Sequence, residues 1–196
     1  MKSFFRLFIC LFLLFPFALQ AQITKGHYVA GGNLNMDFFR ILNTANIQFT
    51  TDLDLSVAYF VSDGLALGVS FPFSYYRSAI TRLNVNELRV GLGPLVRWFP
   101  GKQEGLLNWY LNGQFGMEAG SNTFLVSRNN VLEVIQLSGV AGFVAGGIGT
   151  NVFINSQLAV DLNLSYSYPI LRSDSFANPQ ENLAFRVGLV MFWEKK

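Results

Sequence analysis

One stretch of the sequence decides the fold. Residues 157–168 read QLAVDLNLSYSY, in which a large apolar or aromatic residue stands at every second position from Leu158 to Tyr168. The residues between them are small or polar. Successive side chains of a β-strand point to opposite faces of the sheet, so this period of two predicts a strand with one apolar and one polar face.

The same alternation recurs along the chain, and no helical period of any length interrupts it. It predicts seven further strands, at residues 26–39, 48–61, 65–76, 85–99, 107–120 and 183–193 and somewhere within 133–154. Pro94 interrupts one of these strands and predicts a bulge there. In the sixth strand the run GVAGFVAGGIG, residues 139–149, obscures the two faces. A hairpin hidden in this region, which would give ten strands, therefore stays open.

Short and long connections alternate between the predicted strands. The short turns centre on Asp63, Lys102 and Asn155, and the longer polar links span residues 40–47, 77–84, 121–130 and 169–182. Gly64 in the first turn can adopt a positive φ, as a tight hairpin turn requires. This rhythm predicts eight antiparallel strands in up-and-down order, with the N-terminus on the side of the short turns.

The first 21 residues have the pattern of a cleaved secretory signal peptide. Lys2 and Arg6 precede a wholly apolar run, Pro16 breaks it, and small residues follow up to Ala21. We therefore expect residues 1–21 to be a signal peptide and residues 22–196 to form one barrel domain. Cys10, the only cysteine, would be removed with the signal, and Leu7-Phe8-Ile9 before it are not the small residues that a lipid-attachment site needs.

Composition excludes two further classes of protein. The chain is 51% hydrophobic and 13% charged, which argues against disorder. Fourteen basic residues stand against 12 acidic ones, without a basic cluster beyond Lys195-Lys196, so a nucleic-acid partner is not expected. Removal of Lys2 and Arg6 would leave 12 basic and 12 acidic residues, a formally neutral chain.

Alternation alone does not say which face of the barrel is apolar. A soluble barrel of the lipocalin kind points its large apolar side chains inward, whereas a membrane barrel points them outward. The predicted strands mostly run for about 11–14 residues, which suits tilted strands that cross a bilayer. The interior of an eight-stranded barrel is only wide enough for side chains, so the small and polar face fits inside better than Phe and Leu on every strand. The sequence thus favours the membrane barrel.

Aromatic residues support this arrangement. With the short turns at the periplasmic side, five rings fall together at the periplasmic ends of their strands. Amphipathic rings prefer the interface between membrane and water. The members of this predicted membrane-interface belt are Tyr28, Tyr59, Trp98, Trp109 and Trp193.

The pattern resembles the eight-stranded outer-membrane barrels of Gram-negative bacteria, of the OmpA transmembrane-domain and OmpX type. The resemblance covers the whole chain after residue 21, and the closing strand, VGLVMFW at residues 187–193, looks like the aromatic-ended last strand of that family. Glu194-Lys195-Lys196 follow it here, whereas the family usually ends on the aromatic residue. The resemblance implies an all-β transmembrane barrel in the cell outer membrane, with outer-membrane lipid and the outer-membrane assembly machinery as partners.

Charged residues on the inward face are the candidate functional residues. Arg89 and Glu118 come out nearly opposite each other, and so do Asp37 and Asp52, to which Arg186 could supply a cation across the closing strands. Buried charges must be paired, so these groups predict a salt-bridge network that plugs the lumen, with a metal or gating site as the alternative. The network comprises Asp37, Asp52, Asp54, Glu87, Arg89, Arg97, Glu118, Asp161 and Arg186.

No set of catalytic residues accompanies these charges. His27, the only histidine, falls at the periplasmic end of the first strand, where no Ser/His/carboxylate set can assemble at the outer leaflet. We expect neither an enzyme nor a cofactor, and no metal. The expected function is a structural or surface-interaction role: envelope integrity, adhesion or partnering an envelope complex. The alternative is a narrow pore or a transporter of a small hydrophobic molecule, which an opening near Pro94 or the Gly-rich sixth strand would favour.

Overall fold

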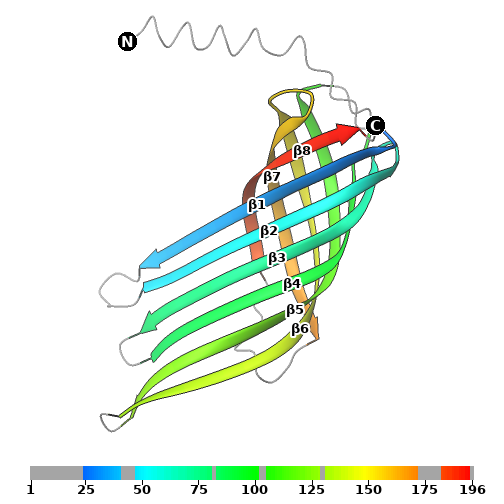
Figure 1. The fold of residues 1–196 in the computed structure, drawn as a ribbon. Coiled ribbons are helices and arrows are strands. Elements are labelled where there is room, and N and C mark those ends of the chain that lie inside the picture. The colour runs from blue at the N-terminus through cyan, green and yellow to red at the C-terminus, as the bar shows by residue number, and fades with distance from the viewer. Residues whose placement is uncertain are drawn as a thin grey trace, which may run out of the picture.

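The fold is known from a computed structural model that describes residues 24–40, 47–80, 83–101, 105–128, 131–171 and 182–194. These residues form eight antiparallel strands, each paired with its neighbours in the sequence, and the last pairs with the first to close a barrel (Figure 1). The expected all-β up-and-down barrel is thereby confirmed. The predicted signal peptide lies outside the described residues. The strands are β1 (His27–Arg40), β2 (Ile47–Ser62), β3 (Leu65–Ile80), β4 (Leu83–Trp98), β5 (Leu107–Arg128), β6 (Val131–Phe153), β7 (Leu158–Leu171) and β8 (Asn182–Glu194).

The sixth strand is one continuous element, so the ten-stranded alternative is wrong. β6 pairs with β5 without a break from Leu107↔Val152 to Arg128↔Val131. The links predicted at 77–84 and 121–130 also lie mostly within strands, the first at the ends of β3 and β4 and the second at the end of β5. Their polar residues weaken the alternation in the sequence, whereas in the barrel a neighbouring strand supplies the backbone hydrogen bonds.

No bulge occurs at Pro94, contrary to the prediction. The same β4–β5 register holds on both sides of it, from Leu92↔Met117 to Leu95↔Gln114. Proline lacks an N–H and interrupts the ladder locally, but it adds no residue to the strand. Register shifts lie elsewhere among the described pairs, between Phe60 and Ser62 and between Gly142 and Phe143.

Two of the three predicted short turns lie within the described residues. Gly64 has a φ of 77°, and a Cβ there would lie 2.7 Å from the carbonyl oxygen of Phe99, so this position favours glycine. In the other turn, the Asn155 Oδ1 accepts the backbone N–H groups of Gln157 and Leu158, both at 2.8 Å. The turn predicted at Lys102 falls on residues that the structure does not describe.

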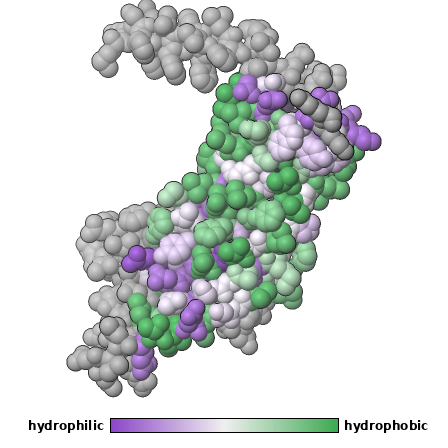
Figure 2. All heavy atoms as spheres, viewed as in Figure 1, coloured by the Kyte–Doolittle hydropathy of each residue, from purple (hydrophilic) through white to green (hydrophobic). Residues whose placement is uncertain are grey.

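Most of the large apolar side chains point away from the barrel axis. On β7, for example, Leu164 and Tyr166 are exposed, whereas Asp161 and Asn163 are buried. The space-filling view shows apolar side chains over much of the visible wall (Figure 2). An apolar surface of this extent is typical of contact with lipid. The soluble, lipocalin-like alternative is therefore wrong.

The aromatic residues of the predicted interface belt gather at the turn end. The ring of Tyr28 lies 5.0 Å from that of Tyr59 and 5.8 Å from that of Trp193, measured between centroids. Trp98 and Trp109 are exposed on β4 and β5, near the short turn that joins these strands. Among the residues described, no helix is long and apolar enough to cross a membrane.

Candidate functional site: a lumen closed at one end

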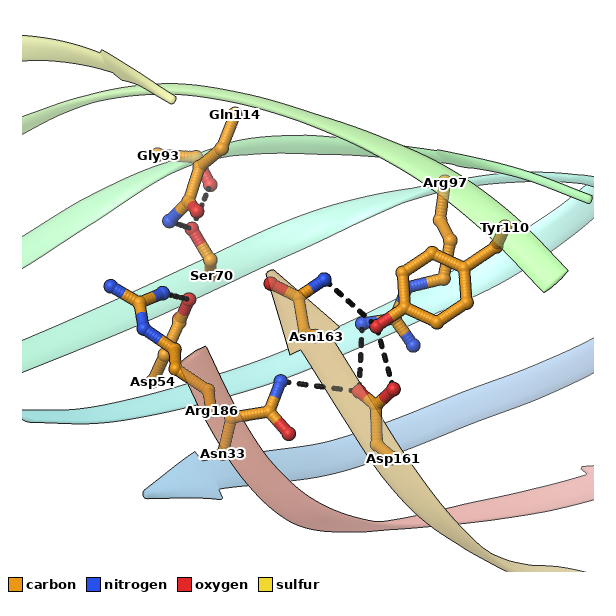
Figure 3. A network of polar contacts seen from close by, with 10 residues as sticks. All are labelled: Asn33, Asp54, Ser70, Gly93, Arg97, Tyr110, Gln114, Asp161, Asn163 and Arg186. Carbon is orange, nitrogen blue, oxygen red and sulfur yellow. Dashed lines mark hydrogen bonds and ion pairs between the residues drawn. The ribbon is translucent and has the colours of Figure 1, made fainter. Parts of the chain in front are cut away.

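The lumen is crossed by a buried network around Asp161 (Figure 3). Asp161, on β7, is fully buried. Its carboxylate accepts a hydrogen bond from the Tyr110 hydroxyl at 2.6 Å and one from the Asn33 Nδ2 at 3.1 Å. The Arg97 Nη2 lies 3.6 Å from the same carboxylate. Residues of β1, β4, β5 and β7 thus meet in the centre of the barrel.

Tyr110 is the second hub of this network. Its hydroxyl oxygen accepts a hydrogen bond from the Asn163 Nδ2 at 3.0 Å, and the Arg97 guanidinium carbon lies 4.4 Å from the centroid of its ring. The buried carboxylate therefore has a cation and two neutral donors, and the buried cation has a carboxylate and a ring face. We call Asn33, Arg97, Tyr110, Asp161 and Asn163 the central layer.

Four buried phenylalanines close the lumen on the turn side of the central layer. The ring centroids of Phe60 and Phe99 are 5.6 Å apart, those of Phe60 and Phe192 are 6.4 Å apart, and those of Phe153 and Phe192 are 5.1 Å apart. Phe99 also packs against Tyr110, at 5.4 Å. This aromatic plug leaves the turn end of the barrel filled with apolar side chains.

The central layer and the aromatic plug include residues that sequence reasoning missed. Asn33, Tyr110, Asn163 and the four phenylalanines were not among the candidate residues. A signal was present, because Phe60, Tyr110 and Phe192 stand at positions that alternation assigns to the small and polar face. Large rings at such positions near the turn ends indicate a filled lumen.

A second group of charges lies on the loop side of the central layer. The Arg186 Nη1 donates to the Asp54 Oδ2 at 3.2 Å. Arg89 pairs with Glu87, and its Nη1 lies 4.0 Å from the Glu118 Oε2, so the predicted Arg89–Glu118 proximity is present. We call this group, together with Asp52, the outer charges.

The predicted Asp37–Asp52–Arg186 arrangement is tested only in part. Asp37 pairs with Thr50 along the β1–β2 ladder, whereas Asp52 pairs with Asn35, so the two acids are offset by two residues. Arg186 contacts Asp54 instead. The side chain of Asp37 lies outside the described part of the chain.

A cavity of about 110 Å³ lies beside the outer charges. Its lining includes Asp52, Asp54, Arg89, Glu118 and Arg186. The side chains of the Arg89–Glu118 and Arg186–Asp54 pairs are between 15% and 21% exposed, whereas the side chain of Arg97 is 5% exposed and that of Asp161 is fully buried. Solvent exposure in the lumen therefore decreases from the outer charges to the central layer.

His27 takes part in neither group. Its Nδ1 lies 3.0 Å from the Thr24 Oγ1 and 3.1 Å from the Thr24 carbonyl oxygen, at the turn end of β1. In the described ranges no group of three His, Cys, Asp or Glu side chains is placed to hold a metal ion. His27 thus has the contacts of a polar residue at the end of a strand.

Comparison with known proteins identifies the architecture. No family model and no curated protein matches the sequence. Among solved structures, a major outer membrane protein from Thermus thermophilus aligns with a TM-score of 0.59 at 11% identity, over 85% of this chain and 99% of that one. The chain has an outer-membrane β-barrel fold. At this identity the likeness concerns the fold alone. The outward apolar surface indicates that lipid surrounds the barrel wall.

Two further barrels align over similar lengths. Neisserial surface protein A gives a TM-score of 0.46 at 13% identity, over 86% of this chain and 97% of that one. The N-terminal β-barrel domain of Pseudomonas aeruginosa OprF gives 0.45 at 10% identity, over 87% and 99%.

Proposed function

We propose that this outer-membrane barrel does not conduct and has a structural or surface-interaction role at the cell envelope. The observation that carries the proposal is the closed lumen, in which the central layer and the aromatic plug lie in series. Neither layer leaves Asp161, Tyr110 or Phe60 in contact with solvent. A barrel that is filled in this way can act through its outer surface and loops.

The outer ends of β5 and β6 supply a surface for interaction. These two strands are the longest of the barrel, and their outer ends reach farthest on the loop side (Figure 1). β4 pairs with β5 as far as Leu83↔Val126, whereas among the described residues the outer part of β6, residues 131–141, pairs with β5 alone. We call this outer part of β6 the ribbon. Val134, Ile135 and Leu137 are exposed there. Strand edges with exposed apolar side chains pair readily with other chains, which favours a protein partner at the cell surface.

The first test is conductance. In a planar bilayer the refolded wild type is expected to be silent, and so is Arg89→Ala, because Arg89 lies on the loop side of the central layer and leaves that layer intact. Recording both proteins under identical voltage and salt checks this. Steady, ion-selective conductance of the wild type would contradict the proposal and favour the alternative function of a narrow pore.

The second test separates structural from interaction roles. Cells lacking the chain are complemented with the wild type or with a ribbon variant, Val134→Asp/Leu137→Asp, and are assayed for detergent sensitivity and for cell–cell aggregation. A surface interaction predicts aggregation with the wild type and its loss in the variant. Equal restoration of detergent resistance by both proteins is expected if the barrel alone stabilises the envelope. No effect of either protein in either assay sinks the proposal.

Transport of a small hydrophobic molecule is the second candidate. One observation favours it: among the described residues β1 pairs with β8 only as far as Leu34↔Val187, although β1 continues to Arg40 and β8 begins at Asn182. The cavity in the outer lumen is lined by five charged side chains, which is unfavourable for an apolar passenger. The outer-membrane assembly machinery remains a proposed partner, with β8 as the recognised strand.

A further inference from the structure

We propose that the ribbon, residues 131–141 of β6, pairs with the ribbon of a second copy of this chain that lies in a facing membrane. The proposal rests on the proposed surface-interaction role and names the partner that this surface takes. One edge of the ribbon pairs with β5, from Val131↔Arg128 to Ala141↔Glu118, and no described residue pairs with the other edge. A long strand edge is therefore left open on the loop side of the barrel.

The open edge of the ribbon lacks the features that keep strand edges apart. Natural edge strands are short, or they carry Lys, Pro or a bulge. Residues 131–141 read VLEVIQLSGVA, which contains no proline and no basic residue, and Glu133 is its only charged residue. The ribbon pairs with β5 without a register shift, and residues 133–138 are all exposed. An edge of this kind pairs readily with another strand.

A second copy of the chain fits this edge better than an unrelated strand does. The far edge of β5 is covered by β4 as far as Leu83↔Val126, so this pair of strands offers one open edge. Two identical edges that pair about a two-fold axis cover each other, because the same surface contributes on both sides. A second copy also brings an edge of equal length and equal alternation. The result is a closed pair rather than an open chain of copies.

The sequence of the ribbon suits an antiparallel pairing with itself. A two-fold axis at Gln136 pairs the whole ribbon and keeps side chains of the same face opposite each other. Ile135 then lies opposite Leu137 on both sides of the axis, which buries two apolar contacts. Glu133 lies opposite Gly139, so the two Glu133 carboxylates are separated along the strands by roughly 20 Å. Their repulsion is screened at this distance, because the Debye length is about 8 Å.

The antiparallel direction places the two barrels in different membranes. β6 runs from Val131 at the loop end to Phe153 at the turn end, and the ribbon continues the barrel wall on the loop side (Figure 1). The two-fold axis is perpendicular to this wall, so it reverses the direction of the barrel axis. The turn ends of the two barrels then point away from each other, which two copies in one membrane cannot satisfy. The pairing therefore joins copies in two facing membranes, as in contact between cells.

Single cysteines test the pairing position by position. The chain from residue 22 onward has no cysteine, so an introduced thiol has no other partner in its own chain. Gln136→Cys should give a disulfide-linked dimer on oxidation, because this position faces its own copy and paired Cα atoms lie about 4.5–5.5 Å apart. Val134→Cys and Ser138→Cys should each stay monomeric alone and form a dimer when they are mixed. Non-reducing electrophoresis of the detergent-refolded barrels measures the linked fraction.

Vesicles distinguish facing membranes from a shared membrane. Val134→Cys is inserted into one vesicle population and Ser138→Cys into another, and the two are mixed and oxidised. The variants should become linked to each other, and the vesicles should cluster until a reductant is added. In the matched control Asp63→Cys, an exposed position in the turn at the other end of the barrel, replaces Ser138→Cys and should give no link.

Three results overturn the proposal: no dimer from Gln136→Cys, a link that forms only when both variants share one vesicle, or an equal link with Asp63→Cys. Folding of each variant is checked first by the shift in gel mobility on heating. If Gln136→Cys does not fold, the mixture of Val134→Cys and Ser138→Cys replaces it, and the absence of a dimer in that mixture counts against the pairing.

An aggregation assay separates this failure from failure of the proposed function. Cells that carry the chain are mixed with differently labelled cells that lack it. Pairing between copies predicts aggregates that contain only cells with the chain. Aggregates that contain both kinds of cell would overturn the pairing of copies, whereas the surface-interaction role would stand with a different molecule as the partner.

Discussion

Asp161→Ala is expected to destabilise the barrel by about 3–5 kcal/mol. The Arg97 guanidinium lies 3.6 Å from this carboxylate, and the Arg97 side chain is only 5% exposed. The substitution therefore leaves a buried cation without the carboxylate that pairs with it. It also removes the acceptor of the Tyr110 hydroxyl and of the Asn33 amide. Each buried donor left unpaired adds to the cost. Urea titration of the protein in lipid vesicles, followed by tryptophan fluorescence, measures the change in the free energy of unfolding.

Two controls make this prediction specific to the buried charge. Asp54→Ala breaks the ion pair with Arg186, whose side chain is 17% exposed, so water can solvate the remaining cation. The loss of folding stability should therefore be about 1 kcal/mol. Adding Arg97→Met to Asp161→Ala removes the orphaned cation and should recover part of the stability. Equal losses in Asp161→Ala and Asp54→Ala, or no recovery in the double variant, would mean that the central layer does not act through its charges.

The sequence predicts the two faces of a strand better than it predicts partners across the lumen. Alternation in β7 places Asp161 inside and Leu164 outside because the outward face contacts lipid and is uniformly apolar. Whether Asp161 meets Arg97 or Arg186 depends on the stagger of strands that are not neighbours, and no local pattern records it. The same holds for Arg186, which contacts Asp54 rather than the expected pair.

Glycine explains why the sequence did not show the two faces of the sixth strand. Residues 139–149 contain five glycines, and a residue without a side chain carries no information about its face. In the barrel this stretch continues as β6, and the Phe143 ring occupies the space above Gly116. The two faces of the sixth strand therefore could not be assigned from the sequence, although the seven other strands were recognisable.

The two barriers in the lumen predict that opening it requires the removal of both. Phe60→Ala takes away a fully buried ring that packs against Phe99 and Phe192, and should cost about 3–5 kcal/mol. Conductance should nevertheless stay absent, because the central layer still crosses the lumen. Arg97→Ala/Asp161→Ala, which leaves no orphaned charge, should also be silent because the aromatic plug remains.

Combining the three substitutions Phe60→Ala, Arg97→Ala and Asp161→Ala should produce pore events in a planar bilayer at a voltage where each barrier alone gives none. The refolded fraction of every variant is measured first, so that leakage from misfolded protein is not counted. Conductance in Phe60→Ala alone would assign the seal to the aromatic plug, and conductance only in Arg97→Ala/Asp161→Ala would assign it to the central layer. The two barriers are in contact, because the ring centroids of Phe99 and Tyr110 lie 5.4 Å apart. The loss of stability in the triple variant should therefore be smaller than the sum of the losses from the separate substitutions.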